Sequence, residues 1–124
     1  MHRSRLAGFI IDCKDADVDR AAGFWSAALG MPLGEREGDT YLKLDASARD
    51  LAVEVQRVSH DSRVHLDIES DDVEAEVARL QKLGARRLEN VKTWVVLEAP
   101  TGQRFCVIRA RSPLEGKPDA QVWK

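Results

Sequence analysis

The chain has 124 residues, 44% of them hydrophobic and 32% charged, which suits one compact domain and excludes a disordered chain. Nineteen Lys and Arg residues nearly balance 21 Asp and Glu residues, so no strong field exists to attract nucleic acid. No segment reaches the roughly 18 apolar residues of a membrane span, and the first apolar run is too short for a signal peptide. We therefore expect a cytoplasmic protein without nucleic-acid or membrane partners, and its two cysteines fit a reducing compartment.

The first half predicts a strand, a helix and three further strands. After the strand-like run LAGFIIDC, apolar residues recur at spacings of three and four from Val18 to Leu29, the pattern of a helix with one buried face. Asp15 or Asp17 can cap the start of this helix, and Gly30 favours a left-handed turn at its end. Strand-like runs follow at 33–36, 40–45 and 51–58, separated by turn residues.

The second half repeats this pattern about 55 residues later. After the run VHLDIE, helical periodicity extends from Val73 to Leu83, Asp71 with Glu74 resembles a capping box, and Gly84 ends the helix. Strand-like runs follow at 86–90, 93–98 and 104–110. The sequence therefore predicts an α+β domain over 1–110, built from one βαβββ module at about 5–58 and another at about 62–110.

Each predicted sheet has one face covered by its helix, so the open faces of the two curved sheets would line a shared central cup. Strand alternation tells which side chains face it. In RVHLDIE, the residues Val64, Leu66 and Ile68 should pack beneath the helix, which leaves His65 and Asp67 on the open face. The same rule gives a predicted cup lining of Ile10, Asp12, Glu54, Gln56, His65, Asp67 and Cys106.

A C-terminal tail, 111–124, follows the second module. It contains two prolines and one glycine and has no periodicity. Its apolar residues Leu114, Val122 and Trp123 could dock across the mouth of the cup or onto a second subunit.

This layout resembles the vicinal oxygen chelate superfamily, and within it the small glyoxalase-like and bleomycin-resistance-like proteins. The segments that carry the resemblance are FWSAALGM, VHLDIESDDVEAEVARLQKLGA and WVVLEAPTGQRFCVI, and it extends over most of the chain. The last segment is the most specific, because APTG lies between two apolar strands where the family usually has Asp-Pro-x-Gly. The resemblance implies the glyoxalase/bleomycin resistance/dioxygenase fold and a homodimer.

Metal-dependent members of that superfamily hold a divalent ion with one ligand from the first strand and one from the last strand of each half. The resemblance places these four positions at Ile10 (or Phe9), Gln56, His65 and Cys106. Only His65 is a usual ligand, since isoleucine has no lone pair and glutamine is a weak neutral donor. Cys106 could bind zinc as a thiolate, with water, Glu54 or Asp67 completing the shell. We therefore expect no cofactor, and a divalent metal at His65 is the alternative.

Three functions stay open on the sequence. The first is a protein that holds a small, partly apolar molecule in the cup without the family's usual metal. The ligand contacts would be Asp12, Glu54, Gln56, Asp67, Trp94 and Cys106. The second is a lyase, isomerase or dioxygenase in which His65 acts as metal ligand or catalytic general base. The third is a non-catalytic interaction module anchored by Trp123. We expect the first, and whether the chain is an enzyme stays open.

Overall fold

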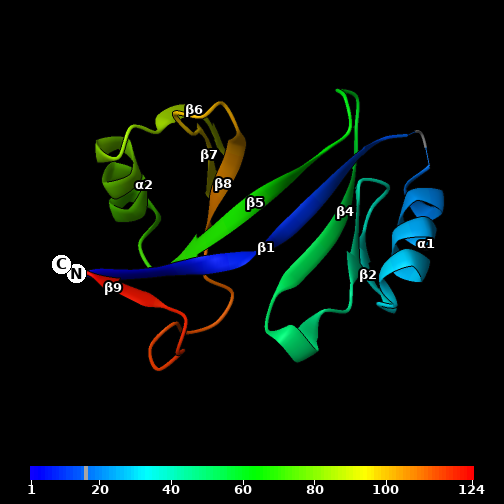
Figure 1. Ribbon diagram of the computed structural model, residues 1–124, viewed down its shortest axis with the longest axis horizontal. Coiled ribbons are helices and arrows are strands. Elements are labelled where there is room, and N and C mark those ends of the chain that lie inside the picture. The colour runs from blue at the N-terminus through cyan, green and yellow to red at the C-terminus, as the bar shows by residue number, and fades with distance from the viewer. Residues whose placement is uncertain (16) are drawn as a thin grey trace. The chain divides into compact units, whose positions relative to one another are not determined.

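The computed structural model describes residues 1–15 and 17–124 and has the predicted element order (Figure 1). The first module consists of β1 (His2–Lys14), α1 (Val18–Leu29), β2 (Leu33–Glu37), β3 (Tyr41–Leu44), the short 3-10 helix η1 (Ser47–Arg49) and β4 (Ala52–Val58). The second consists of β5 (Arg63–Ser70), α2 (Val73–Lys82), β6 (Arg86–Val91), β7 (Trp94–Glu98), β8 (Arg104–Arg109) and a last strand, β9 (Gln121–Trp123). The α+β fold with two βαβββ modules is confirmed. Among the described residues, no helix is long and apolar enough to cross a membrane.

The chain divides into two compact units that differ slightly from the two modules. The first unit is Gly8–His65, and the second combines Met1–Ala7 with Leu66–Lys124. The N-terminal end of β1 therefore packs with the second module rather than with its own. Strands β1 and β5 each pass continuously from one unit into the other.

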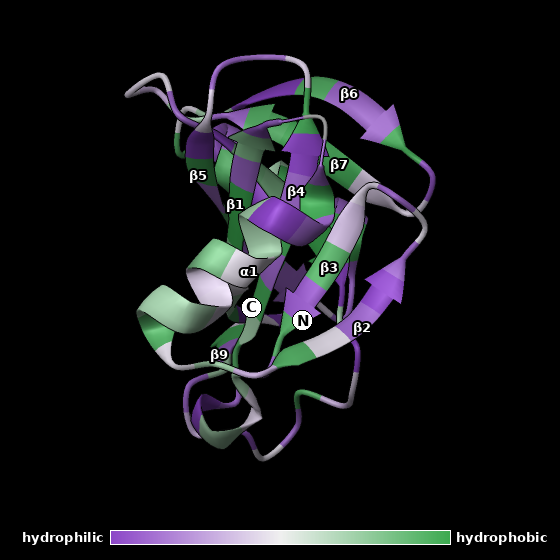
Figure 2. Cartoon of the chain, turned by 90° about the vertical axis from the view of Figure 1, so that its right-hand side faces the viewer, coloured by the Kyte–Doolittle hydropathy of each residue, from purple (hydrophilic) through white to green (hydrophobic). Residues whose placement is uncertain are grey.

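In the first unit, α1 covers one face of the strands β3 and β4. Strand β1 pairs with β4 in parallel, and β3 pairs with β2 and β4 in antiparallel fashion. In β3 the alternate residues Leu42 and Leu44 are buried, and Figure 2 shows the hydrophobic and hydrophilic stretches of the strands. The buried core consists of Ile11, Val18, Ala22, Leu42, Leu44, Ala46, Val53 and Val55.

The ends of α1 follow the sequence prediction. Of the two candidate caps, Asp17 is the one used, because its carboxylate accepts the backbone N–H groups of Asp19 and Arg20 at 3.0 and 3.2 Å. Gly30 ends the helix in the left-handed conformation with φ of 68°. These caps fix the direction in which α1 lies across the sheet.

In the second unit, α2 packs on β6, β7 and β8. Strand β5 pairs with β8 in parallel, and β7 pairs with β6 and β8 in antiparallel fashion. The buried core consists of Val77, Leu80, Val95, Leu97 and Val107.

The prediction for the helix side of β5 was only partly right. Ile68 packs against the core, but Val64 and Leu66 are 58% and 45% exposed. Strand β5 pairs with β8 from Asp67 to Ser70, so Ile68 lies in the paired part of the strand, whereas Val64 and Leu66 precede it.

The predicted capping box of α2 was wrong by one residue. Asp72 is the cap, and its carboxylate accepts the N–H of Ala75 at 3.0 Å. The carboxylate of Asp71 instead accepts the backbone N–H and the guanidinium of Arg3, at 2.7 and 3.2 Å. A tertiary contact with β1 therefore takes the carboxylate that the local pattern assigned to the helix.

The tail docks on its own chain. Strand β9 pairs antiparallel with the N-terminal end of β1, with Trp123 opposite His2. The Trp123 indole N–H donates to the Ser4 hydroxyl at 2.9 Å, and Leu114 is 2% exposed. A three-residue strand shows no alternation in the sequence, which is why β9 was not predicted.

A buried glutamate joins the tail, β1 and α2. Glu76 is fully buried and accepts hydrogen bonds of 2.8 Å from His2 and from two nitrogens of Arg79. The Arg79 guanidinium lies 3.8 Å from the ring centre of Trp123. Burial alone would raise the pKa of Glu76, but hydrogen bonds from Arg79, His2 and Ser4 outweigh it and lower the pKa to about 2.

The free energy of unfolding should therefore fall as the pH drops from about 4.5, the ordinary pKa of glutamate, to about 2. The contribution of Glu76 is complete above the unfolded-state pKa and disappears below the folded-state pKa, where both states are protonated. It amounts to roughly 3 kcal/mol. Urea unfolding, followed by tryptophan fluorescence across this pH range, should show the loss in the wild-type chain and much less of it in Glu76→Gln.

The matched control for this experiment is Glu74→Gln. It removes another carboxylate from α2, and the Glu74 side chain is 71% exposed. This variant should keep the wild-type dependence of stability on pH, because exposed charges contribute little. An unchanged acid slope in Glu76→Gln would show that another group causes the loss.

A close approach of β1 to β4 gives a second prediction. Gly8 lies opposite Ala52, and a Cβ at this glycine would overlap the Ala52 carbonyl oxygen. Gly8→Ala should lower the free energy of unfolding by roughly 3 kcal/mol, because the strand backbones would have to separate. In contrast, Gly23→Ala in α1 meets no atom within 4 Å and should raise stability by up to about 1 kcal/mol. Chemical denaturation of the two variants tests this, and equal effects would contradict it.

Candidate functional site

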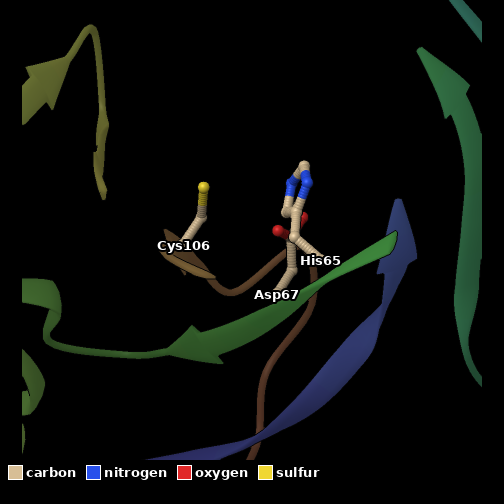
Figure 3. Close-up of side chains that lie close together, drawn as sticks. All are labelled: His65, Asp67 and Cys106. Carbon is tan, nitrogen blue, oxygen red and sulfur yellow. The ribbon is translucent and has the colours of Figure 1, made fainter. Parts of the chain in front are cut away.

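Three side chains with metal-binding or acid–base chemistry meet on β5 and β8. His65 and Asp67 lie two residues apart on β5 and so share a face, and the parallel pairing places Cys106 of β8 opposite Asp67. One potential ligand atom from each of these residues lies within 4.8 Å of the other two. Figure 3 shows the three side chains projecting to the same side of the strands. We call this group the donor cluster.

Asp12 of β1 contacts the imidazole of His65. Its Oδ2 lies 2.8 Å from His65 Nδ1 and 3.3 Å from Arg63 Nε. The side chains of Asp12 and His65 are 1% and 12% exposed, so water competes little for this hydrogen bond. The other oxygen of Asp12, Oδ1, is buried and has no hydrogen-bond partner among the described residues.

The internal repeat extends to the site. Asp12 pairs in register with Gln56 of β4, in the same way that Asp67 pairs with Cys106 of β8. Each module therefore places a buried aspartate on its first strand opposite a polar residue on its last strand. The Gln56 amide donates a hydrogen bond of 3.0 Å to the hydroxyl of Tyr41.

Two other predicted contacts lie outside the donor cluster. Glu54 is 9% exposed and stands in register with Ile10 on one side and Lys43 on the other. Trp94 begins β7 and is on the same face of that strand as Val96, whose partner on β8 is Cys106. Trp94 therefore lies on the same face of the sheet as Cys106.

Sequence reasoning missed Arg63, whose guanidinium donates to Asp12. Alternation already placed Arg63 on the face of His65 and Asp67, so the pattern could have found it. Its position at the start of β5, where side chains are commonly solvated, concealed this role.

The residues at the four metal positions that the sequence resemblance implies do not fit the usual ion. Ile10 is buried and offers no lone pair, and Gln56 offers only a weak neutral donor. The donor cluster is a different set, because an imidazole, a carboxylate and a thiolate suit zinc with one coordination position open. Without an ion, the same imidazole beside a carboxylate can take up or release a proton.

Comparison with known proteins supports the predicted fold. A sequence model of the glyoxalase-like domain matches residues 8–108. No curated protein sequence matches the chain.

Solved structures resemble the chain at low identity. A hypothetical protein from Bacillus halodurans is 11% identical with a TM-score of 0.66, over 90% of this chain and 98% of the other. Methylmalonyl-CoA epimerase from Mycobacterium tuberculosis is 15% identical with a TM-score of 0.66, over 88% and 89% of the two chains. Homoprotocatechuate 2,3-dioxygenase from Brevibacterium fuscum, in complex with 3,4-dihydroxyphenylacetate, is 16% identical with a TM-score of 0.60, over 85% of this chain and 36% of the other. At these identities, the likeness shows the fold alone.

Proposed function

The chain belongs to the glyoxalase-like domain family, and from this premise we propose that it binds a small, partly apolar molecule beside the donor cluster, without the family's usual metal. The epimerase and the dioxygenase belong to the vicinal oxygen chelate superfamily, so the resemblance seen in the sequence is confirmed. The observation that carries the proposal is the mixed character of the face around Cys106. Binding sites for small molecules combine a few polar groups with apolar surroundings.

The apolar surroundings come from β7 and β8. Trp94 and Val96 share one face of β7, and Ile108 lies two residues beyond Cys106 on β8. All three side chains are half-buried, so they retain surface that a ligand can cover. The Trp94 ring can stack on a planar ligand, while His65 and Asp67 supply hydrogen bonds.

The predicted contacts in the first unit have different roles in this proposal. Asp12 is buried against His65 and acts through that imidazole rather than by touching the ligand. Glu54 and Gln56 stay predicted ligand contacts. The small-molecule ligand is the expected partner, and the homodimer stays a prediction.

Ligand binding can be tested with 3,4-dihydroxyphenylacetate, a planar, partly apolar probe, as one member of a panel of small aromatic acids. Binding should raise the melting temperature and perturb the NMR signals of Trp94 and His65. Trp94→Ala and His65→Ala should each weaken binding about tenfold, because each removes one direct contact. The matched control is Phe24→Ala, which removes an aromatic side chain that is 64% exposed on α1 and should leave affinity unchanged.

If no panel member binds at millimolar concentration, or if the perturbed signals map only to residues outside β5, β7 and β8, the proposed binding face is wrong.

A second function is favoured by the short spacing of the donor cluster. A lyase, isomerase or dioxygenase of this superfamily would use an ion held by His65, Asp67 and Cys106. A divalent ion supplies Lewis acidity toward an oxygen of the substrate. His65 without an ion would instead serve such an enzyme as a general base.

Cobalt titration separates the two functions. If the chain is a metal enzyme, about one equivalent of Co²⁺ should bind and give a thiolate charge-transfer absorption, because Cys106 would be a ligand. Cys106→Ser should abolish that absorption, whereas Cys13→Ser, the control for the other thiol, should keep it. If the leading proposal is correct, purified protein should hold less than about a tenth of an equivalent of metal and show no such band.

A further inference from the structure

We propose that Asp12 is a positioning residue that fixes the tautomer of His65. Its carboxylate would hold the proton on Nδ1, so that Nε2 is the imidazole nitrogen able to accept a hydrogen bond. This inference rests on the proposed function, because it assumes that His65 faces the ligand. It also deepens that function, since an acceptor at Nε2 selects ligands that carry a hydrogen-bond donor such as a hydroxyl group.

The hydrogen-bond pattern around Asp12 determines which His65 nitrogen carries the proton. Arg63 Nε can only donate, and it lies 3.3 Å from Asp12 Oδ2, so this oxygen is an acceptor. The same oxygen lies 2.8 Å from His65 Nδ1. A nitrogen lone pair facing this acceptor would be repelled, and therefore Nδ1 must be the protonated nitrogen.

Burial strengthens the preference of His65 for the tautomer protonated at Nδ1. Asp12 is 2% exposed, and its partner imidazole is only 12% exposed, so solvent cannot substitute for the lost hydrogen bond. Both residues belong to the first unit, and the strands that carry them hold the pair in place. In a neutral imidazole with Nδ1 protonated, Nε2 is an acceptor. A carboxylate that orients a histidine in this way also raises its strength as a base or ligand.

The tautomer is measurable without any ligand. In the chain labelled with ¹⁵N-histidine, a long-range ¹H–¹⁵N correlation spectrum of the neutral imidazole should show His65 protonated at Nδ1. The His65→Gln variant assigns the signal. His2 in the same spectrum should show the opposite tautomer, with the proton on Nε2, because this nitrogen lies 2.8 Å from Glu76. A wild-type His65 protonated at Nε2 would overturn the proposal directly, whatever the variants do.

Variants then test whether Asp12 causes the preference. In Asp12→Asn and Asp12→Ala, His65 should lose the single Nδ1–H pattern, while His2 keeps its pattern and so reports an intact fold. The matched control is Arg63→Gln, which removes one donor to Asp12 but leaves the carboxylate, and should keep His65 protonated at Nδ1. Retention of the wild-type pattern in a folded Asp12→Ala chain would refute the proposal.

A binding measurement distinguishes this inference from the proposed function. Asp12→Asn should weaken binding of 3,4-dihydroxyphenylacetate at least about tenfold, the usual effect of removing a carboxylate that orients a histidine. If the wild-type chain binds neither this probe nor any other panel member, the proposed function fails, and the tautomer spectrum still decides the role of Asp12. If the probe binds equally to Asp12→Asn and wild type, the positioning role fails while the binding function stands.

Discussion

The parallel pairing of the first and last strands of each module is the constraint on which the site depends. A strand that returns in parallel needs a crossing connection, and here a helix and an antiparallel strand pair supply it in both modules. The pairing brings residues that are 44 or 39 positions apart into register, Asp12 with Gln56 and Asp67 with Cys106. Because each helix covers only one face of its sheet, these polar residues occupy the face that the helix leaves open.

Local sequence patterns correctly predicted the features that neighbouring residues determine. Helix periodicity, the Asp17 cap and the left-handed Gly30 depend on neighbouring residues in the chain, and the structure agrees with all three. The errors at Asp71 and Leu66 have another origin, because the Asp71 carboxylate accepts hydrogen bonds from Arg3, and Leu66 precedes the part of β5 that pairs with β8. Both depend on residues distant in sequence. The partner of His65 was missed for the same reason, since Asp12 lies 53 positions away.

Two buried carboxylates illustrate the difference between a structural and a functional ionic group. Both oxygens of Glu76 accept hydrogen bonds, from His2 and Arg79, as expected of a charge buried for stability. Asp12 uses only Oδ2, and its buried Oδ1 has no hydrogen-bond partner among residues 1–15 and 17–124. A buried carboxylate oxygen without a hydrogen bond lowers stability. A role toward His65 therefore explains the burial of Asp12 better than a contribution to stability does.

The two modules are alike in backbone and different in chemistry. The alignment of the repeats places Ile10 where the second module has His65, so the first module has an isoleucine in place of that imidazole. Isoleucine offers no lone pair, and Gln56 and Cys106 also differ from the ligands usual at their positions, so the four positions do not form the usual shell. In the proposed function, Nε2 of His65 would accept a ligand hydroxyl, and in the second function it would bind an ion beside Asp67 and Cys106. Both uses need the same tautomer, and therefore both need the Asp12 carboxylate where β1 holds it.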